Sequence, residues 1–96
     1  GMSTAARIGP NAILQTVAAL RARHGAALAH RVLAVGTGRT PDALPAAMVD
    51  EREVQALVRA VHDACGAAGA DAVLADAGGR TGDYLLAHRI PRAAQL

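Results

Sequence analysis

The densest group of side chains that could do chemistry lies near the end of the chain, and consists of Arg80, Thr81, Asp83, Tyr84, His88 and Arg89. On a helix, residues three or four positions apart share one side, so Arg80 can contact Tyr84, and Tyr84 can contact His88. In one interpretation this is a ligand-binding helix, where Arg80 or Arg89 holds a carboxylate and Tyr84 or His88 faces a ring or a metal. The interpretation we favour is a solvated charged face beside the packed side chains of Tyr84 and Leu85.

Histidine and cysteine spacing gives little support for a metal site. His62 and Cys65 lie three residues apart on a predicted helix, while His24 and His30 flank the first predicted helix connection. Zinc sites take three or four protein ligands, and no second cysteine completes a set. We therefore interpret Cys65 as a small buried apolar side chain. The sequence predicts no metal, no cofactor and no catalytic residue in this region.

Two glycine clusters superficially resemble phosphate-binding loops: Gly36-x-Gly38 and Gly78-Gly79-x-x-Gly82. A phosphate loop follows a strand and, in its Walker form, contains a lysine. The chain has no lysine, because all 10 of its basic residues are arginine. We expect these glycines instead to end one helix, at 36–38, and to allow close packing or a mild kink in another, at 78–79.

Apolar residues at helical spacing predict an all-α fold, a small bundle of four main helices with a long C-terminal helix. The predicted helices run over about 10–25, over 26–35, from 50 to either Gly66 or Gly69, and over 70–89. The third is the best defined, since Asp50 can cap it and Glu53 occupies the capping-box position. Its apolar stripe is Val54, Leu57, Val58, Val61 and Cys65. A short helical turn is expected at 42–47, and Pro91 is expected to end the last helix.

Composition agrees with helices rather than sheets. The 96 residues fit one domain and include 25 alanines, the best helix former, with no phenylalanine or tryptophan. Alanine buries little surface, so we expect modest stability, and a homodimer is one way to bury more. The net charge is +2 and the arginines are scattered, so nucleic-acid binding is not expected.

The two ends of the chain suggest how the domain is organised. Residues 1–9 are expected to be a flexible lead without the features of a signal peptide, and 10–96 a single helical domain. No apolar run is long enough to span a membrane, and the single Cys65 suits a reducing compartment, so we expect a cytoplasmic protein. Residues 91–96 look like the first turn of a further helix, which suggests a truncated domain.

Three segments resemble one family: residues 7–13 (RIGPNAI), 48–54 (MVDEREV) and 79–91 (GRTGDYLLAHRIP). They are similar to the N-terminal half of the J protein family of bacteriochlorophyll synthesis, known as 4-vinyl protochlorophyllide reductases of photosynthetic bacteria. The resemblance implies a following vinyl-4-reductase domain, an α/β unit associated with small-molecule or hydrocarbon binding. That domain is missing from these residues, and it would be the first partner of this region.

Three functions therefore stay open. The whole protein could reduce the 4-vinyl group of a chlorophyllide precursor, although whether it is an enzyme is not decided by any motif in this chain. It could instead be a non-catalytic protein that binds and delivers a tetrapyrrole intermediate, with Arg80, Tyr84, His88 and Arg89 as its candidate ligand-binding residues. Or the helical region could be only a scaffold or dimerisation module.

Overall fold

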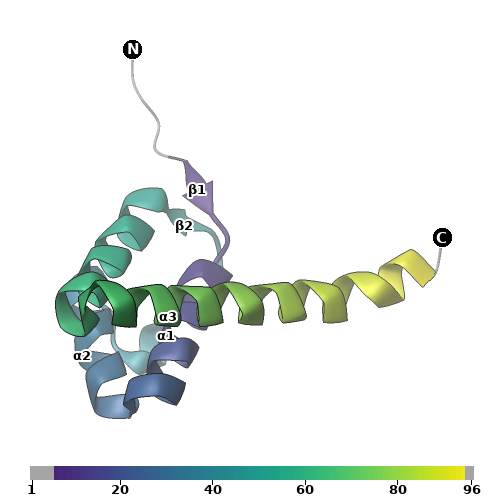
Figure 1. Ribbon diagram of the computed structural model, residues 1–96. Helices are drawn as coiled ribbons and strands as arrows, with labels where there is room; N and C mark the ends of the chain where they lie inside the picture. Colours follow the sequence, from purple (N-terminus) through teal and green to yellow (C-terminus); the bar gives the residue numbers. More distant parts are fainter. Residues whose placement is uncertain (1–5, 95–96) are drawn as a thin grey trace.

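The computed structural model describes residues 6–94, with the side chains of residues 6–87, and it is mostly helical (Figure 1). In chain order its elements are β1 (Arg7–Ile8), α1 (Asn11–His24), α2 (Ala26–Thr37), the 3₁₀ turn η1 (Pro41–Ala43), β2 (Val49–Asp50) and α3 (Glu51–Ala94). The all-α prediction is therefore confirmed in outline. The structure differs from the prediction in two respects, the number of helices and the presence of a small sheet.

The described part of the chain has three helices where four were predicted, because α3 runs from Glu51 to Ala94 as one element with a break at Gly66. Gly66 has φ 72° and ψ 172°, a conformation that glycine adopts far more readily than other residues. We call residues 51–65 the first arm of α3 and residues 67–94 the second arm. Figure 1 shows the chain turning sharply between them, so the second arm runs as a long rod past the other helices.

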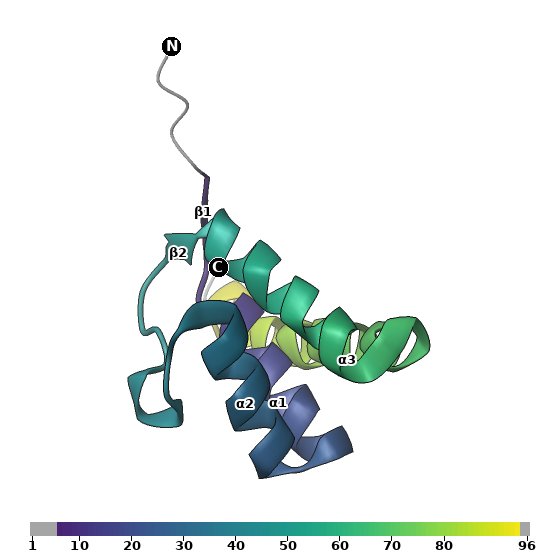
Figure 2. The ribbon, with the colours of Figure 1, turned by 90° about the vertical axis from the view of Figure 1, so that its left-hand side faces the viewer.

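The core lies where the two arms of α3 pack against α1 and α2 (Figure 2). Its largest fully buried side chains are Ile13, Leu20, Leu33, Leu57, Val61 and Val73. All three helices contribute, and alanines such as Ala29 and Ala70 fill the space between them. Small side chains let the helices approach closely, which explains how a chain rich in alanine builds a core.

The predicted apolar stripes extend further than the core does. The stripe that helical spacing predicts for the first helix, Ile13, Val17, Leu20 and His24, ends in the exposed His24. The stripe predicted for the second helix, Leu28, Val32 and Val35, ends in Val35, which is 74% exposed. On the second arm the last buried residue of the described side chains is Ala77, and Tyr84 and Leu85 beyond it are exposed. Figure 1 shows the C-terminal end of α3 projecting beyond α1. Helical periodicity identifies an apolar face, but it does not say how far along the helix a neighbour reaches.

The sheet lies partly in the segment expected to be a flexible lead. Strands β1 and β2 are antiparallel, with Arg7 opposite Asp50 and Ile8 opposite Val49. The amide of Glu51 also donates to the carbonyl of Ala6, at 2.9 Å. Strands of two residues carry no readable alternation, so the sequence pattern did not predict this pairing.

Asp50 caps α3 as predicted, but Glu53 does not complete the capping box. The Asp50 carboxylate accepts a hydrogen bond from the amide of Arg52 at 2.8 Å, the usual N-cap arrangement. The Glu53 carboxylate instead accepts from the Arg39 guanidinium, with 3.2 Å between Nη2 and Oε1. The ion pair with Arg39 therefore takes the place of the local hydrogen bond to a backbone amide.

The prediction that Pro91 ends the last helix is wrong for the backbone, because α3 continues to Ala94. A proline inside a helix removes one hydrogen bond but does not always end the helix.

The helical turn expected at 42–47 is shorter than predicted, since η1 covers only Pro41–Ala43. Within residues 6–94, no helix is long and apolar enough to cross a membrane.

Candidate functional site

The candidate site forms where the second arm of α3 meets the end of α1. Arg80 Nε donates to Asp76 Oδ1 at 2.8 Å, an i, i+4 pair on α3. Arg23, in the last turn of α1, donates through its own Nε to Asp76 Oδ2 at 3.0 Å. One carboxylate thus bridges two guanidinium groups from two helices, and it fastens the end of α1 to the second arm.

The electrostatics of this bridge favour the ionised carboxylate. The hydrogen bond from Arg80 lowers the pKa of Asp76, the bond from Arg23 adds to it, and partial burial opposes both. The Asp76 side chain is 20% exposed, against 39% for Arg80 and 46% for Arg23. Ion pairs this close to water contribute little to stability, so the geometry fixes the orientation of the arginines more than it stabilises the fold.

A shallow, open depression of about 650 Å³ surrounds the bridge. It is lined by Arg23, Ala75, Asp76, Gly79, Arg80 and Asp83. Two arginines and two aspartates give this lining no net formal charge. An incoming carboxylate could bind Arg80 or Arg23 only by competing with Asp76, which disfavours the ligand-holding role predicted for Arg80.

The structure describes the side chains of two of the four predicted site residues. Arg80 belongs to the bridge, and Tyr84 lies one turn further along α3, 41% exposed. His88 and Arg89 continue the same helix, but their side chains lie outside the described residues. Thr81, from the same polar group, donates to the carbonyl of Ala77 at 3.0 Å.

The sequence pattern did not predict the partners that complete this site. Asp76 was detectable, because it precedes Arg80 by four residues on one helix. Arg23 was not, since it is 53 residues away from Asp76 and no local spacing connects them.

The metal-ligand candidates do not come together in the described part of the chain. Across those residues, no three His, Cys, Asp or Glu side chains are grouped so as to hold a metal ion. His62 is exposed, whereas Cys65 is half-buried and packs against the core. The packing of Cys65 agrees with its interpretation as a small apolar side chain.

The close packing predicted at Gly78 and Gly79 occurs at Gly36 instead. A side chain added at Gly78 or Gly79 would meet no atom within 4 Å, so close helix packing does not explain that pair. Their backbone is also helical, because the only non-helical residue inside α3 is Gly66. The close approach occurs at Gly36, predicted only as a helix end, where an added Cβ would lie 2.8 Å from the Leu57 Cα.

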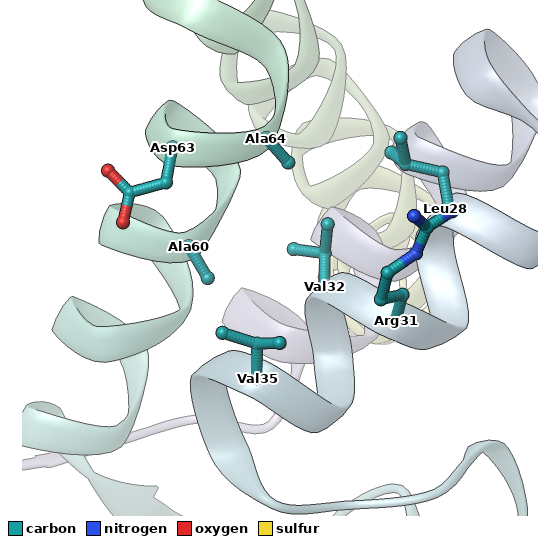
Figure 3. A pocket seen from close by; sticks show the side chains of 7 residues that line it. All are labelled: Leu28, Arg31, Val32, Val35, Ala60, Asp63 and Ala64. Atoms are coloured by element: carbon teal, nitrogen blue, oxygen red, sulfur yellow. The ribbon is translucent and has the colours of Figure 1, made fainter.

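A second feature, which the sequence did not predict, is a groove between α2 and the first arm of α3 (Figure 3). Its volume is about 290 Å³, and it is lined by Leu28, Arg31, Val32, Val35, Ala60, Asp63 and Ala64. We call this the α2–α3 groove. Figure 3 shows Arg31 on one rim and Asp63 on the other, with apolar side chains between them.

Comparison with models of protein families gives no match, and neither does comparison with curated proteins or with solved structures. The resemblance to the J protein family therefore stays a prediction.

Proposed function

We propose that this chain is a helical docking domain of a bacteriochlorophyll-biosynthesis protein of the J family, acting in the cytoplasm. In this proposal the second arm of α3 packs against the vinyl-4-reductase domain that the family resemblance implies. Any vinyl reduction would take place in that other domain, and the helical region would contribute neither cofactor nor catalytic group.

The observation that carries the proposal is the exposed apolar end of the second arm. Beyond Ala77, the described part of the arm presents Tyr84, Leu85 and Leu86, which are 41%, 42% and 59% exposed. Adjacent large apolar residues on a projecting helix characterise a contact surface more than a solvated one. The polar group at residues 80–83 borders this surface, as polar residues border protein interfaces generally.

A binding experiment with matched variants tests the proposal. The chain is titrated with a separately expressed vinyl-4-reductase domain of the J family, and binding is followed by calorimetry. We expect saturable binding that the double variant Leu85→Asp, Leu86→Asp weakens at least about tenfold, because charge is placed in an apolar contact. Met48→Asp is the control, since Met48 is 54% exposed in a different part of the fold. Absence of binding by the parent chain, or equal loss in the control, would contradict the proposal.

The convergence of Arg23 and Arg80 on one carboxylate position is the observation behind a second candidate, the delivery of a tetrapyrrole intermediate, in which the pigment would have to displace Asp76. Here a pigment carboxylate would replace Asp76 between Arg23 and Arg80, with Tyr84 close to the ring. Titration with divinyl protochlorophyllide, followed by absorbance, distinguishes the two candidates. Delivery requires that this chain alone bind pigment, that Asp76→Asn strengthen binding by freeing both arginines, and that Arg80→Gln weaken it. If the absorption bands of the pigment do not shift in the presence of the chain, the pigment does not bind. The carrier candidate is then eliminated and the docking candidate is left.

A further inference from the structure

The α2–α3 groove combines an apolar floor with opposite charges on its two rims. Val32 and Ala60 are buried in its floor, whereas Val35 projects into it and is 74% exposed. Isolated exposed valines are common, but this one lies beside a concave apolar surface. The groove can therefore accept apolar side chains, and it also presents one.

The rim charges have no partner within the part of the chain that the structure describes. Arg31 and Asp63 are both exposed, and neither takes part in an ion pair or side-chain hydrogen bond with another described residue. Figure 3 shows them on opposite sides of the groove, Arg31 on α2 and Asp63 on the first arm of α3, with the Asp63 carboxylate directed away from Ala60 and Ala64. A partner that fits would carry a negative charge facing Arg31 and a positive charge facing Asp63.

A second copy of this chain has that arrangement. When a two-fold axis runs along the groove, each rim of one copy faces the opposite rim of the other copy. Arg31 then faces the second copy's Asp63, and Asp63 faces its Arg31, so one contact occurs twice, as in any isologous interface. The same axis brings the exposed Val35 of each copy toward the apolar floor of the other.

We propose that the α2–α3 groove is the homodimer interface of this protein, held by two symmetric Arg31–Asp63 pairs around a Val35-centred apolar contact. The surface is separate from the end of the second arm, so the dimer and the docking function are independent. The groove is lined by seven residues, far fewer than the roughly 20–30 a side of a standard interface. We therefore expect a weak dimer, with a dissociation constant above about 1 µM.

Charge reversal in separate copies tests the pairing. Arg31→Asp places two negative rims opposite each other and Asp63→Arg two positive rims, so each variant alone should dissociate at least about tenfold more readily. Mixed together, the two variants should form a heterodimer, because every reversed charge then faces an opposite one. Arg21→Asp is the control, since Arg21 is exposed at the end of α1 and makes the same change of charge elsewhere.

Sedimentation equilibrium measures the association, and circular dichroism shows that each variant remains helical. The proposal predicts a concentration-dependent dimer for the parent and the Arg21→Asp control, mostly monomer for each single reversal, and dimer for the equimolar mixture. A parent chain that stays monomeric up to on the order of 1 mM overturns it, and leaves the groove to a different partner. A dimer that persists in Arg31→Asp, or a mixture that stays monomeric while the parent dimerises, also overturns it.

Discussion

Replacing Gly36 by alanine tests how closely α2 approaches the first arm of α3. An ideal Cβ at this position would lie 2.8 Å from the Leu57 Cα, and 3.2 Å from both the Ala56 carbonyl oxygen and the Leu57 amide nitrogen. These are all backbone atoms, so rotation of a side chain cannot relieve the contact. The two helices would have to move apart, and the fully buried Leu57 would lose contacts in the core.

Two effects of opposite sign decide the size of the change. Alanine is favoured over glycine in the interior of a helix by about 1 kcal/mol. Gly36 is the second-to-last residue of α2, so it is not in the interior and the gain is smaller there. Overpacking a close contact costs about 1–3 kcal/mol, and the steric effect therefore wins. We expect a net loss of about 1–2 kcal/mol. For a domain of this size, that lowers the Tm by roughly 5–10 °C.

Thermal unfolding followed by circular dichroism measures the effect, and Gly78→Ala is the matched control. Gly78 is also helical, but a side chain there would meet no atom within 4 Å. The control should gain about 1 kcal/mol and raise the Tm by roughly 5 °C. If Gly36→Ala raised the Tm as the control does, that result would refute the close approach of α2 to α3.

Two further substitutions test polar groups of the fold. Arg52 lowers the pKa of Asp50 from 3.8 to about 2, so its ionised form stabilises the fold above about pH 4, and this contribution disappears as the pH falls toward 2. Asp50→Asn keeps the N-cap and should flatten the loss of Tm between pH 4 and pH 2 that the parent shows. The buried Nε2 of His30 has no hydrogen-bond partner among the described residues, so His30→Leu should raise the Tm at neutral pH by roughly 5 °C, for about 1 kcal/mol. An unchanged or lower Tm would mean that Nε2 is satisfied in solution.

The helical elements were predictable because the signals that specify them are local. Apolar residues at 3.6-residue spacing located the stripes, and Ile13, Val17 and Leu20 are buried as that spacing requires. Gly25 separates α1 from α2 with φ 88° and ψ 165°, a backbone conformation that glycine adopts far more readily than other residues. Each of these features depends on a few neighbouring residues and on the period of one helix.

Several departures depend on contacts between residues far apart in the chain. The pairing of β1 with β2 joins residues about 42 positions apart, and strands of two residues leave no alternating pattern. The close approach at Gly36 depends on where the first arm of α3 crosses α2. The groove likewise combines side chains from those two elements. Sequence spacing describes the faces of single helices, and all of these features lie between elements.

Glu53 shows how a tertiary contact can displace a local one. Its position three residues after Asp50 suits a capping box, but both of its oxygens accept hydrogen bonds from Arg39 instead. The Arg39 guanidinium donates two hydrogen bonds to this carboxylate, whereas a capping box would supply only one, from a backbone amide. Arg39 also donates to the carbonyl of Ala43 at 3.0 Å, so it links η1 to α3.

A tertiary contact also determines the orientation of Arg80 in the polar group at residues 80–89. Arg80 shares the carboxylate of Asp76 with Arg23, which comes from another helix. Any function of that group must therefore be tested on both arginines.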